Sequence, residues 1–114
     1  MDEMAWRAVL FDFYGALLTP KQREIYDWYY QKDLSLGEIA KEQGVSRQAV
    51  YDLLKRSDEA LNTYEEKLEL VKKYEEHNKL LREVRTLMVR VSEKHPDIGL
   101  HDLFLLINKI EDIW

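Results

Sequence analysis

Apolar residues recur at intervals of three and four along almost the whole chain, with charged residues between them. This spacing places apolar side chains on one face of an α-helix, so the sequence predicts an all-α protein. Breaks in the pattern separate five predicted helices. They cover about residues 3–18, 20–31, 35–43, 46 onward and 98–114.

The segment Ser35–Arg56 (SLGEIAKEQGVSRQAVYDLLKR) has the pattern of a helix-turn-helix. Ser35 and Glu38 match a capping box at the start of its first helix. Gly44 stands where the chain must turn sharply, a position that favours φ > 0. Ser46 is suited to cap the second helix.

The apolar residues of this segment are expected to face the core. Ala40 is small enough to let the two helices cross closely. The Val45 side chain, in the turn, is predicted to be buried in the core. The second helix is expected to bury Val50, Leu53 and Leu54. Its exposed side is predicted to carry Arg47, Gln48, Tyr51, Asp52 and Lys55. An ordinary helical hairpin is the alternative, but the caps, the small residue and the turn glycine together favour a helix-turn-helix.

The first two predicted helices are rich in aromatic residues. One face of the first helix carries Arg7, Phe11, Tyr14 and Leu18. Thr19, Pro20 and Gln22 predict a capped start for the second helix. This second helix contains Ile25, Tyr26, Trp28, Tyr29 and Tyr30. Packing against a core is the favoured interpretation of these aromatic side chains, and stacking on nucleobases is the alternative.

No proline or glycine interrupts the sequence between Arg47 and His95. The helix that follows Ser46 is therefore expected to run straight on, or to bend at the weak helix formers at 57–58 or 62–63. Apolar residues beyond it form a heptad-like seam with a discontinuity near Tyr74. The seam consists of Leu61, Tyr64, Leu68, Val71, His77, Leu81, Val84, Met88 and Val91.

Pro96 ends this long helical stretch, and Asp97 is a candidate cap for the last helix. The last helix carries a second apolar stripe, made of Leu100, Leu103, Phe104, Ile107, Ile110 and Trp114. An N-terminal domain of about sixty residues is too small to cover both stripes, so we expect a homodimer. The alternative is a monomer in which the long helix breaks near 77–78 and folds into a compact bundle. The sequence thus predicts a helix-turn-helix domain at 1–58 and a helical, dimerising extension at 59–114.

Composition and charge limit the class of protein further. The chain has no cysteine, so neither a disulfide framework nor a thiolate metal site is expected. The net charge of −5 argues against a protein that coats nucleic acid nonspecifically. Residues 35–56 carry four basic and three acidic side chains, so any grip on phosphates should be weak and sensitive to salt. The start of the chain does not look like a signal peptide and no apolar run could span a membrane, which predicts a cytoplasmic protein.

No pattern in the chain predicts catalysis. His77, His95 and His101 do not pair with a His or Glu at the spacing of a zinc site. There is neither a Gly-rich phosphate loop nor a nucleophile elbow. The acidic residues within 57–76 are mixed with lysines and are interpreted as a solvated helix surface. The sequence therefore predicts no enzyme, no catalytic residue, no metal site and no cofactor.

The run FYGALLTPKQ, the pair Tyr29-Tyr30 and the segment 35–56 together resemble the YlxM family of small bacterial helix-turn-helix proteins. The resemblance is dense from about Leu10 to Arg56 and weak beyond Tyr64. The same helix-turn-helix is similar to region four of bacterial sigma factors. The resemblance implies a regulatory role in the signal recognition particle pathway, because this family is associated with the gene of the particle's GTPase subunit.

Three functions follow from these observations. The resemblance implies an accessory or regulatory factor of the signal recognition particle, with the particle's RNA or its GTPase as partner. The helix-turn-helix by itself allows a sequence-specific DNA-binding transcriptional regulator, and a surface that docks a protein is the third alternative. A helix cannot read the deep, narrow major groove of RNA, so an RNA partner would be contacted through phosphates or loops. For either nucleic acid the candidate contact residues are Ser46, Arg47, Gln48, Tyr51, Lys55 and Arg56.

Overall fold

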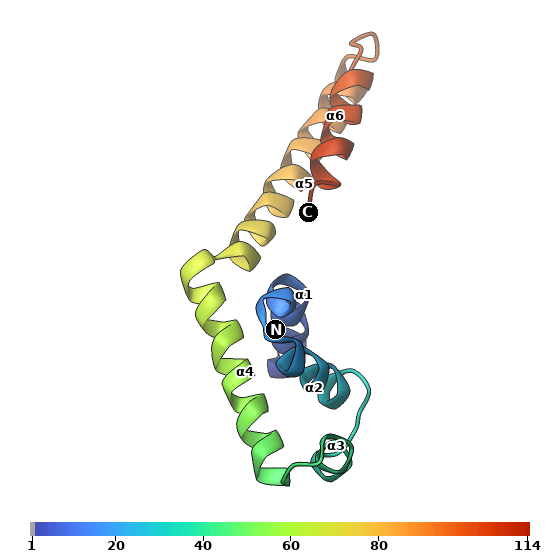
Figure 1. Cartoon of the computed structure of the whole chain (residues 1–114). Helices are drawn as coiled ribbons and strands as arrows, with labels where there is room; N and C mark the ends of the chain where they lie inside the picture. The colour runs from blue at the N-terminus through green and yellow to red at the C-terminus, as the bar shows by residue number, and fades with distance from the viewer. Residues whose placement is uncertain (1) are drawn as a thin grey trace. The chain divides into compact units, whose positions relative to one another are not determined.

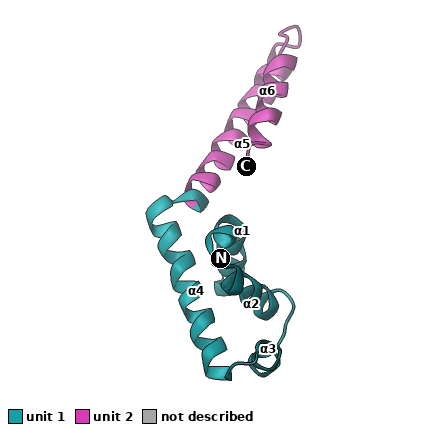
Figure 2. Ribbon diagram, viewed as in Figure 1, with its two compact units in different colours: residues 1–71 teal, residues 72–114 magenta. Residues whose placement is uncertain are grey.

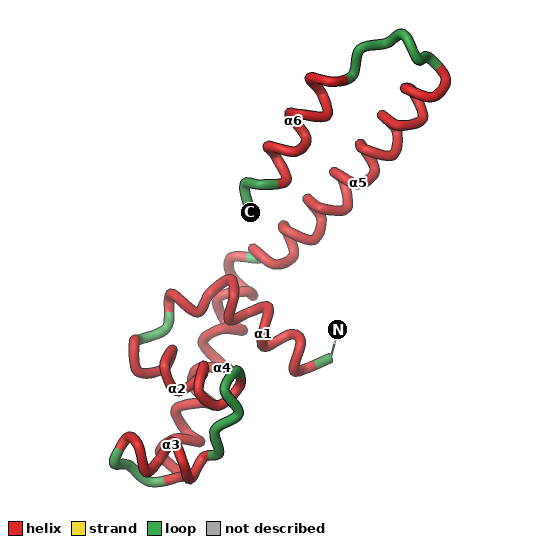
Figure 3. Tube along the Cα trace, turned by 90° about the vertical axis from the view of Figure 1, so that its right-hand side faces the viewer, coloured by secondary structure: helices red, strands yellow, loops and turns green. Residues whose placement is uncertain are grey.

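A computed structural model describes residues 2–114 and confirms the predicted all-α architecture (Figure 1). The chain divides into two compact units, one ending at Val71 and the other beginning at Lys72 (Figure 2). Within the described residues the regular structure is entirely helical, and short loops join the helices (Figure 3). The elements are α1 (Glu3–Tyr14), the 3₁₀ helix η1 (Gly15–Leu17), α2 (Pro20–Tyr30), α3 (Leu36–Gln43), α4 (Arg47–Leu68), α5 (Leu70–Lys94) and α6 (His101–Glu111).

The first unit has one apolar core to which α1, α2, α3 and α4 all contribute side chains. Its fully buried large side chains include Leu10, Tyr14, Ile25, Tyr26, Ile39 and Leu61. The rings of Phe11 and Tyr26 stack at a centroid distance of 5.2 Å, which joins α1 to α2. The packing interpretation is therefore confirmed for Tyr26, the most deeply buried aromatic residue of α2.

The two predicted capping boxes are confirmed. The hydroxyl of Thr19 accepts a hydrogen bond from the amide of Gln22, and the Gln22 side chain accepts one from the Thr19 amide. Ser35 and Glu38 make the same reciprocal pair at the start of α3. Because each box satisfies amide groups that lack an intrahelical partner, both helices begin at the predicted residues.

The turn between α3 and α4 follows the prediction with one exception. Gly44 ends α3 in the left-handed conformation with φ of +64°, and the Ser46 hydroxyl caps α4 by accepting from the Ala49 amide at 3.0 Å. The amide of Val45 donates to the carbonyl oxygen of Ala40 at 3.0 Å. The prediction that the Val45 side chain is in the core is wrong, since it is 43% exposed. The backbone hydrogen bond closes the turn and leaves that side chain pointing outward.

Two predicted helix boundaries need correction. The first helix is α-helical only to Tyr14, and the 3₁₀ turn η1 carries the chain from there to Leu17. The long helix bends at neither of the two expected places, because α4 passes without interruption through 57–58 and 62–63. It ends instead at Leu68, and the next residue, Glu69, has a left-handed conformation with φ of +54°. The predicted domain boundary after residue 58 lies inside α4, whereas the compact units separate after Val71.

The second unit, residues 72–114, is a hairpin of two antiparallel helices (Figure 2). Leu81 and Met88 of α5 and Ile107 of α6 are buried between the helices. The helix break at Pro96 is confirmed, but the expected cap at Asp97 is wrong. The N-cap of α6 is Leu100, which provides no side-chain hydrogen bond.

Candidate nucleic-acid interface

All six predicted contact residues are exposed, and they lie at the N-cap or in the first half of α4. Two of them also have local structural tasks. The hydroxyl of Ser46 caps the helix, and the Gln48 side chain donates a hydrogen bond to Asp52 Oδ1 at 3.0 Å. The capping bond accounts for the presence of Ser46, so its hydroxyl is the weakest candidate for a direct contact.

Four of the six residues line two neighbouring surface hollows, and we call these four the α4 strip. The α4 strip consists of Arg47, Gln48, Tyr51 and Lys55. Arg56 lines neither hollow, because it lies roughly 100° further round the helix than Lys55. The structure therefore brings four predicted residues onto one side of α4, next to α3, and leaves Arg56 on another side.

The first of these hollows, which we call the outer hollow, has a volume of about 290 Å³. It lies where Leu36 of α3 meets Arg47, Gln48 and Tyr51 of the α4 strip. The Arg47 side chain passes over the first turn of α3, close to Gly37. The outer hollow thus places a guanidinium and an amide side by side at the exposed corner of the helix-turn-helix.

The second hollow, which we call the tyrosine hollow, has a volume of about 230 Å³. It lies where α1, α2, α3 and α4 meet. Its lining consists of Arg7, Tyr29, Tyr30, Leu36, Tyr51, Leu54, Lys55 and Asp58. Leu36 and Tyr51 line both hollows, so the two form a continuous surface along the α4 strip.

Asp58 organises the floor of the tyrosine hollow. Its carboxylate accepts hydrogen bonds from the Tyr26 hydroxyl at 2.7 Å, from Arg7 Nε at 3.3 Å and, more weakly, from the Tyr30 hydroxyl at 3.5 Å. Arg7 also pairs with Glu3 at 2.9 Å, and its guanidinium lies 5.1 Å from the centre of the Tyr30 ring. These contacts fix the positions of α1, α2 and α4 relative to one another around the tyrosine hollow.

The interpretation of the acidic residues within 57–76 as solvated surface is wrong for Glu65, which is half-buried and accepts hydrogen bonds from the Tyr14 hydroxyl and the Val71 amide. It is also wrong for Asp58. Its side chain is 23% exposed and faces the interface of three helices. Sequence reasoning missed it because its partners are distant in the chain, on α1 and α2. The one available signal was helical spacing, since Asp58 follows Val50 and Leu54 of the buried face at intervals of four.

The tyrosines bonded to Asp58 have perturbed acidity. Burial, together with the hydrogen bond to the Asp58 carboxylate, raises the pKa of the Tyr26 hydroxyl well above its usual range. Burial and the charge of Asp58 also raise the pKa of Tyr30 to about 12. Both effects disfavour the tyrosinate, so these hydroxyl groups act as hydrogen-bond donors to Asp58.

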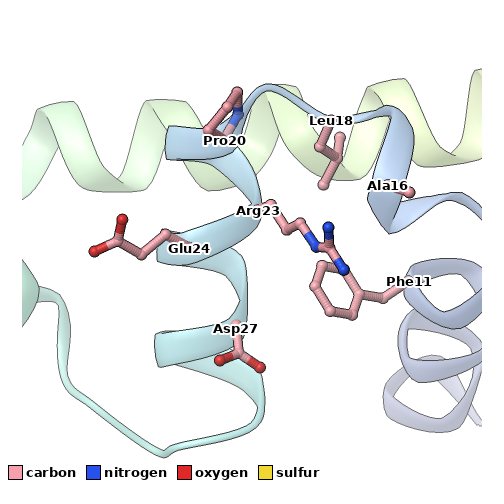
Figure 4. A pocket seen from close by; sticks show the side chains of 7 residues that line it. All are labelled: Phe11, Ala16, Leu18, Pro20, Arg23, Glu24 and Asp27. Atoms are coloured by element: carbon pink, nitrogen blue, oxygen red, sulfur yellow. The ribbon is translucent and has the colours of Figure 1, made fainter.

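A third hollow of about 520 Å³ lies beside η1 and α2 and shares no lining residue with the other two (Figure 4). The Arg23 side chain extends toward the ring of Phe11, and the Glu24 side chain points away from that ring. Asp27 is the third charged residue of this lining. With one base and two acids, the third hollow does not offer the positive surface that a phosphate needs.

Two further findings concern the whole of residues 2–114. No three His, Cys, Asp or Glu side chains among them are grouped so that they could hold a metal ion. None of the helices in this range combines the length and the apolar character needed to cross a bilayer.

The capped α3, the left-handed turn at Gly44 and the exposed start of α4 define a helix-turn-helix protein. A family model described as "Putative helix-turn-helix protein, YlxM / p13 like" matches residues 1–99. The chain belongs to this family, UPF0122.

Named relatives agree with this membership. A UPF0122 protein of Caldanaerobacter subterraneus subsp. tengcongensis is 52% identical over 84 residues, which cover 74% of this chain and 72% of the relative. A UPF0122 protein of Anoxybacillus flavithermus is 48% identical over 103 residues, covering 90% of this chain and 91% of the relative. One from Thermoanaerobacter sp. is 48% identical over 99 residues, 85% of each chain.

Proposed function

We propose that the protein is an accessory or regulatory factor of the bacterial signal recognition particle pathway, which binds nucleic acid or the particle through its helix-turn-helix. The observation that carries the binding role is the α4 strip, which presents Arg47, Gln48, Tyr51 and Lys55 on an otherwise acidic protein. The resemblance to YlxM proteins links the chain to the particle, with its RNA or its GTPase as partner. The helical fold and the family point to a binding protein rather than an enzyme.

The charge distribution favours a selective contact over a general affinity for nucleic acid. The chain carries a net charge of −5, and its helix-turn-helix segment contains only one more base than acid. Few phosphates can be neutralised by so small an excess, so affinity from charge alone is low and falls quickly with salt. Selectivity must then come from shape and from individual side chains.

A DNA-binding transcriptional regulator is the second candidate. Arg47 and Gln48 lie in the first turn of α4, the part of a recognition helix that contacts base edges in a major groove. Arginine pairs bidentately with guanine and glutamine with adenine, so these two residues suit direct readout of a DNA sequence.

The test compares two probes at the same salt concentration, signal recognition particle RNA and a DNA duplex of random sequence. Tighter binding to the RNA supports the first candidate, and clearly tighter binding to the duplex replaces it with the second. The double variant Arg47→Ala, Gln48→Ala should weaken binding to the preferred probe. Arg90→Ala, which removes an exposed arginine of α5, is the matched control. If the double variant keeps its helicity and full affinity for both probes, the α4 strip does not bind nucleic acid.

The second unit is proposed to form a homodimer. Arg85 of α5 covers one side of the α5–α6 hairpin, where its guanidinium donates hydrogen bonds to Glu111 at 2.8 Å and to Asn108 at 2.9 Å. Helical periodicity defines which residues lie on the opposite side. The opposite side carries apolar side chains that are 39–60% exposed, and we call it the apolar face. The apolar face consists of Leu80, Val84, Leu87, Val91, Leu103, Leu106 and Ile110.

The proposed occupant of the apolar face is a second copy of the hairpin. A unit this small buries too little apolar surface to be stable alone, and here the buried cluster consists of Leu81, Met88 and Ile107. Because both helices contribute to the apolar face, two hairpins can pair about a two-fold axis as a four-helix bundle. Such a dimer would carry two helix-turn-helix heads, and two modest contacts would reinforce each other.

A further inference from the structure

We propose that the tyrosine hollow receives one unstacked nucleobase from a single-stranded or looped segment of nucleic acid. This inference rests on the proposed nucleic-acid-binding function and specifies the kind of strand that is bound. It assigns the aromatic rings of α2 a role besides packing.

The hollow offers flat aromatic surface at a position that a bound strand would pass. The half-buried Tyr29 ring packs edge to face with the Tyr30 ring at a centroid distance of 4.9 Å. The Tyr30 ring is itself covered by the Arg7 guanidinium at 5.1 Å and by the Tyr26 ring at 4.6 Å, so Tyr29 is the residue of α2 that offers a surface to a base. Tyr51, which is 50% exposed, approaches from α4 and also lines the outer hollow. Aromatic side chains next to a positively charged groove are the usual platform for bases of single strands.

The floor of the tyrosine hollow selects a base over a phosphate. The Asp58 carboxylate would repel a phosphate, while an exocyclic amino group of a base can donate to such an acceptor. Arg7 shares its one positive charge between Asp58 and Glu3, so the three groups together carry a net negative charge and do not attract an anion. Lys55, which is exposed beside the hollow, is available for the phosphate of the same nucleotide.

The size of the tyrosine hollow also favours a single nucleobase as its ligand. Its volume of about 230 Å³ is below the ~300–1,000 Å³ of pockets for drug-sized ligands, so it suits a single heterocycle. A paired base inside a duplex is stacked on both faces and cannot reach the rings. Only a base that has left the stack, in a loop, bulge or single strand, can enter.

Together the two hollows separate two tasks. Arg47 and Gln48 at the outer hollow would hold any strand that passes the α4 strip, duplex or not. Tyr29 lies on α2, outside the α4 strip, and would contribute only when an unstacked base is present. Variants at these two places therefore distinguish the inference from the function on which it depends.

The experiment measures fluorescence anisotropy with three labelled probes at matched salt: an RNA hairpin with a single-stranded loop, the fully paired RNA duplex of its stem, and the DNA version of the hairpin. We expect the hairpins to bind more tightly than the duplex. Comparison of the RNA and DNA hairpins identifies which backbone supplies the base. Equal affinity for hairpins and duplex would overturn the inference and leave nucleic-acid binding itself intact.

The decisive variant is Tyr29→Leu, which removes a ring but retains an apolar side chain. It should weaken hairpin binding at least about fivefold and leave duplex binding unchanged. Tyr51→Phe, which keeps its ring, should preserve the hairpin preference, whereas Tyr51→Ala should reduce it. Arg47→Ala should weaken all three probes. Unchanged hairpin affinity of Tyr29→Leu would refute the inference, and absence of binding to every probe would refute the proposed nucleic-acid binding with it.

A second readout does not depend on the stability of any variant. Loop positions of the RNA hairpin are replaced by 5-iodouridine, which photocrosslinks to aromatic rings stacked on it, and the crosslinked peptide is identified by mass spectrometry. We expect the crosslink on Tyr29 or Tyr51 of the wild-type protein. A crosslink confined to other aromatic residues would place the base outside the tyrosine hollow.

Discussion

The hydroxyl group of Tyr14 donates a hydrogen bond to Oε1 of Glu65 at 2.5 Å and thereby joins α1 to the last turns of α4. The same two side chains accept hydrogen bonds from the first two backbone amides of α5. Leu70 N donates to the Tyr14 hydroxyl and Val71 N donates to Glu65 Oε1, both at 3.0 Å. Because the first amides of a helix lack intrahelical acceptors, this pair caps α5 from outside its own sequence.

Tyr14→Phe should lower the free energy of unfolding by about 1–3 kcal/mol, because it leaves the Leu70 amide without its acceptor in a buried setting. Urea denaturation followed by circular dichroism measures the effect. Tyr64→Phe is the matched control, since the Tyr64 hydroxyl makes only a long bond of 3.4 Å to the Leu17 carbonyl oxygen. Equal losses in the two variants would show that the cap on α5 does not contribute specifically.

Glu69→Gly should raise the free energy of unfolding by about 0.5–1 kcal/mol. Glu69 has φ of +54°, and glycine adopts this left-handed conformation without the penalty paid by residues with a Cβ atom. The thermal unfolding midpoint measures the change. Gly44→Ala supplies the opposite test at φ of +64° and should destabilise the protein. A lower midpoint for Glu69→Gly would contradict the left-handed break between α4 and α5.

The stability of the first unit should fall as the pH rises from about 10 to 12. The pKa of Tyr30 is raised from 10.0 to about 12, first by burial and then by the charge of Asp58. A raised pKa means that the folded state binds more protons than the unfolded state across this interval. The contribution is therefore fully present below about pH 10 and is lost as the pH approaches 12.

Tyr30→Phe should make this alkaline loss of stability shallower, because it removes the hydroxyl group whose pKa is raised. Denaturation midpoints at a series of pH values, with tyrosinate absorbance recorded in parallel, provide the measurement. Part of the alkaline loss of stability should remain in the Tyr30→Phe variant, because the pKa of Tyr26 is also raised. An identical slope for wild type and Tyr30→Phe would contradict the assignment to Tyr30.

Val84→Asp should shift the protein from dimer to monomer. Val84 lies on the apolar face, and in the proposed four-helix bundle the new carboxylate would be buried without a partner. Sedimentation equilibrium at micromolar concentration measures the mass. Val89→Asp is the matched control, because Val89 is equally exposed at 43% but lies on another side of α5. A wild-type monomer would refute the homodimer directly.

The sequence by itself determined the helix-turn-helix, because every signal for it is local. The caps at Thr19, Ser35 and Ser46 each act on an amide three residues away, and Gly44 adopts its left-handed conformation within a single turn. The helical period likewise identified the exposed start of α4. Interactions of this range are formed within one element and do not depend on how the helices pack.

Only the tertiary structure decided the place of the break near Glu69 and the composition of the tyrosine hollow. Tyr14 meets Glu65 across 51 positions of the chain, and Tyr26 meets Asp58 across 32. The mixture of acids and lysines around Asp58 led to its assignment to a solvated surface, because its hydrogen-bond partners lie far away in the sequence. A hydrogen bond between distant residues exists only after packing has placed donor and acceptor together, so helical periodicity predicts the elements but not these contacts.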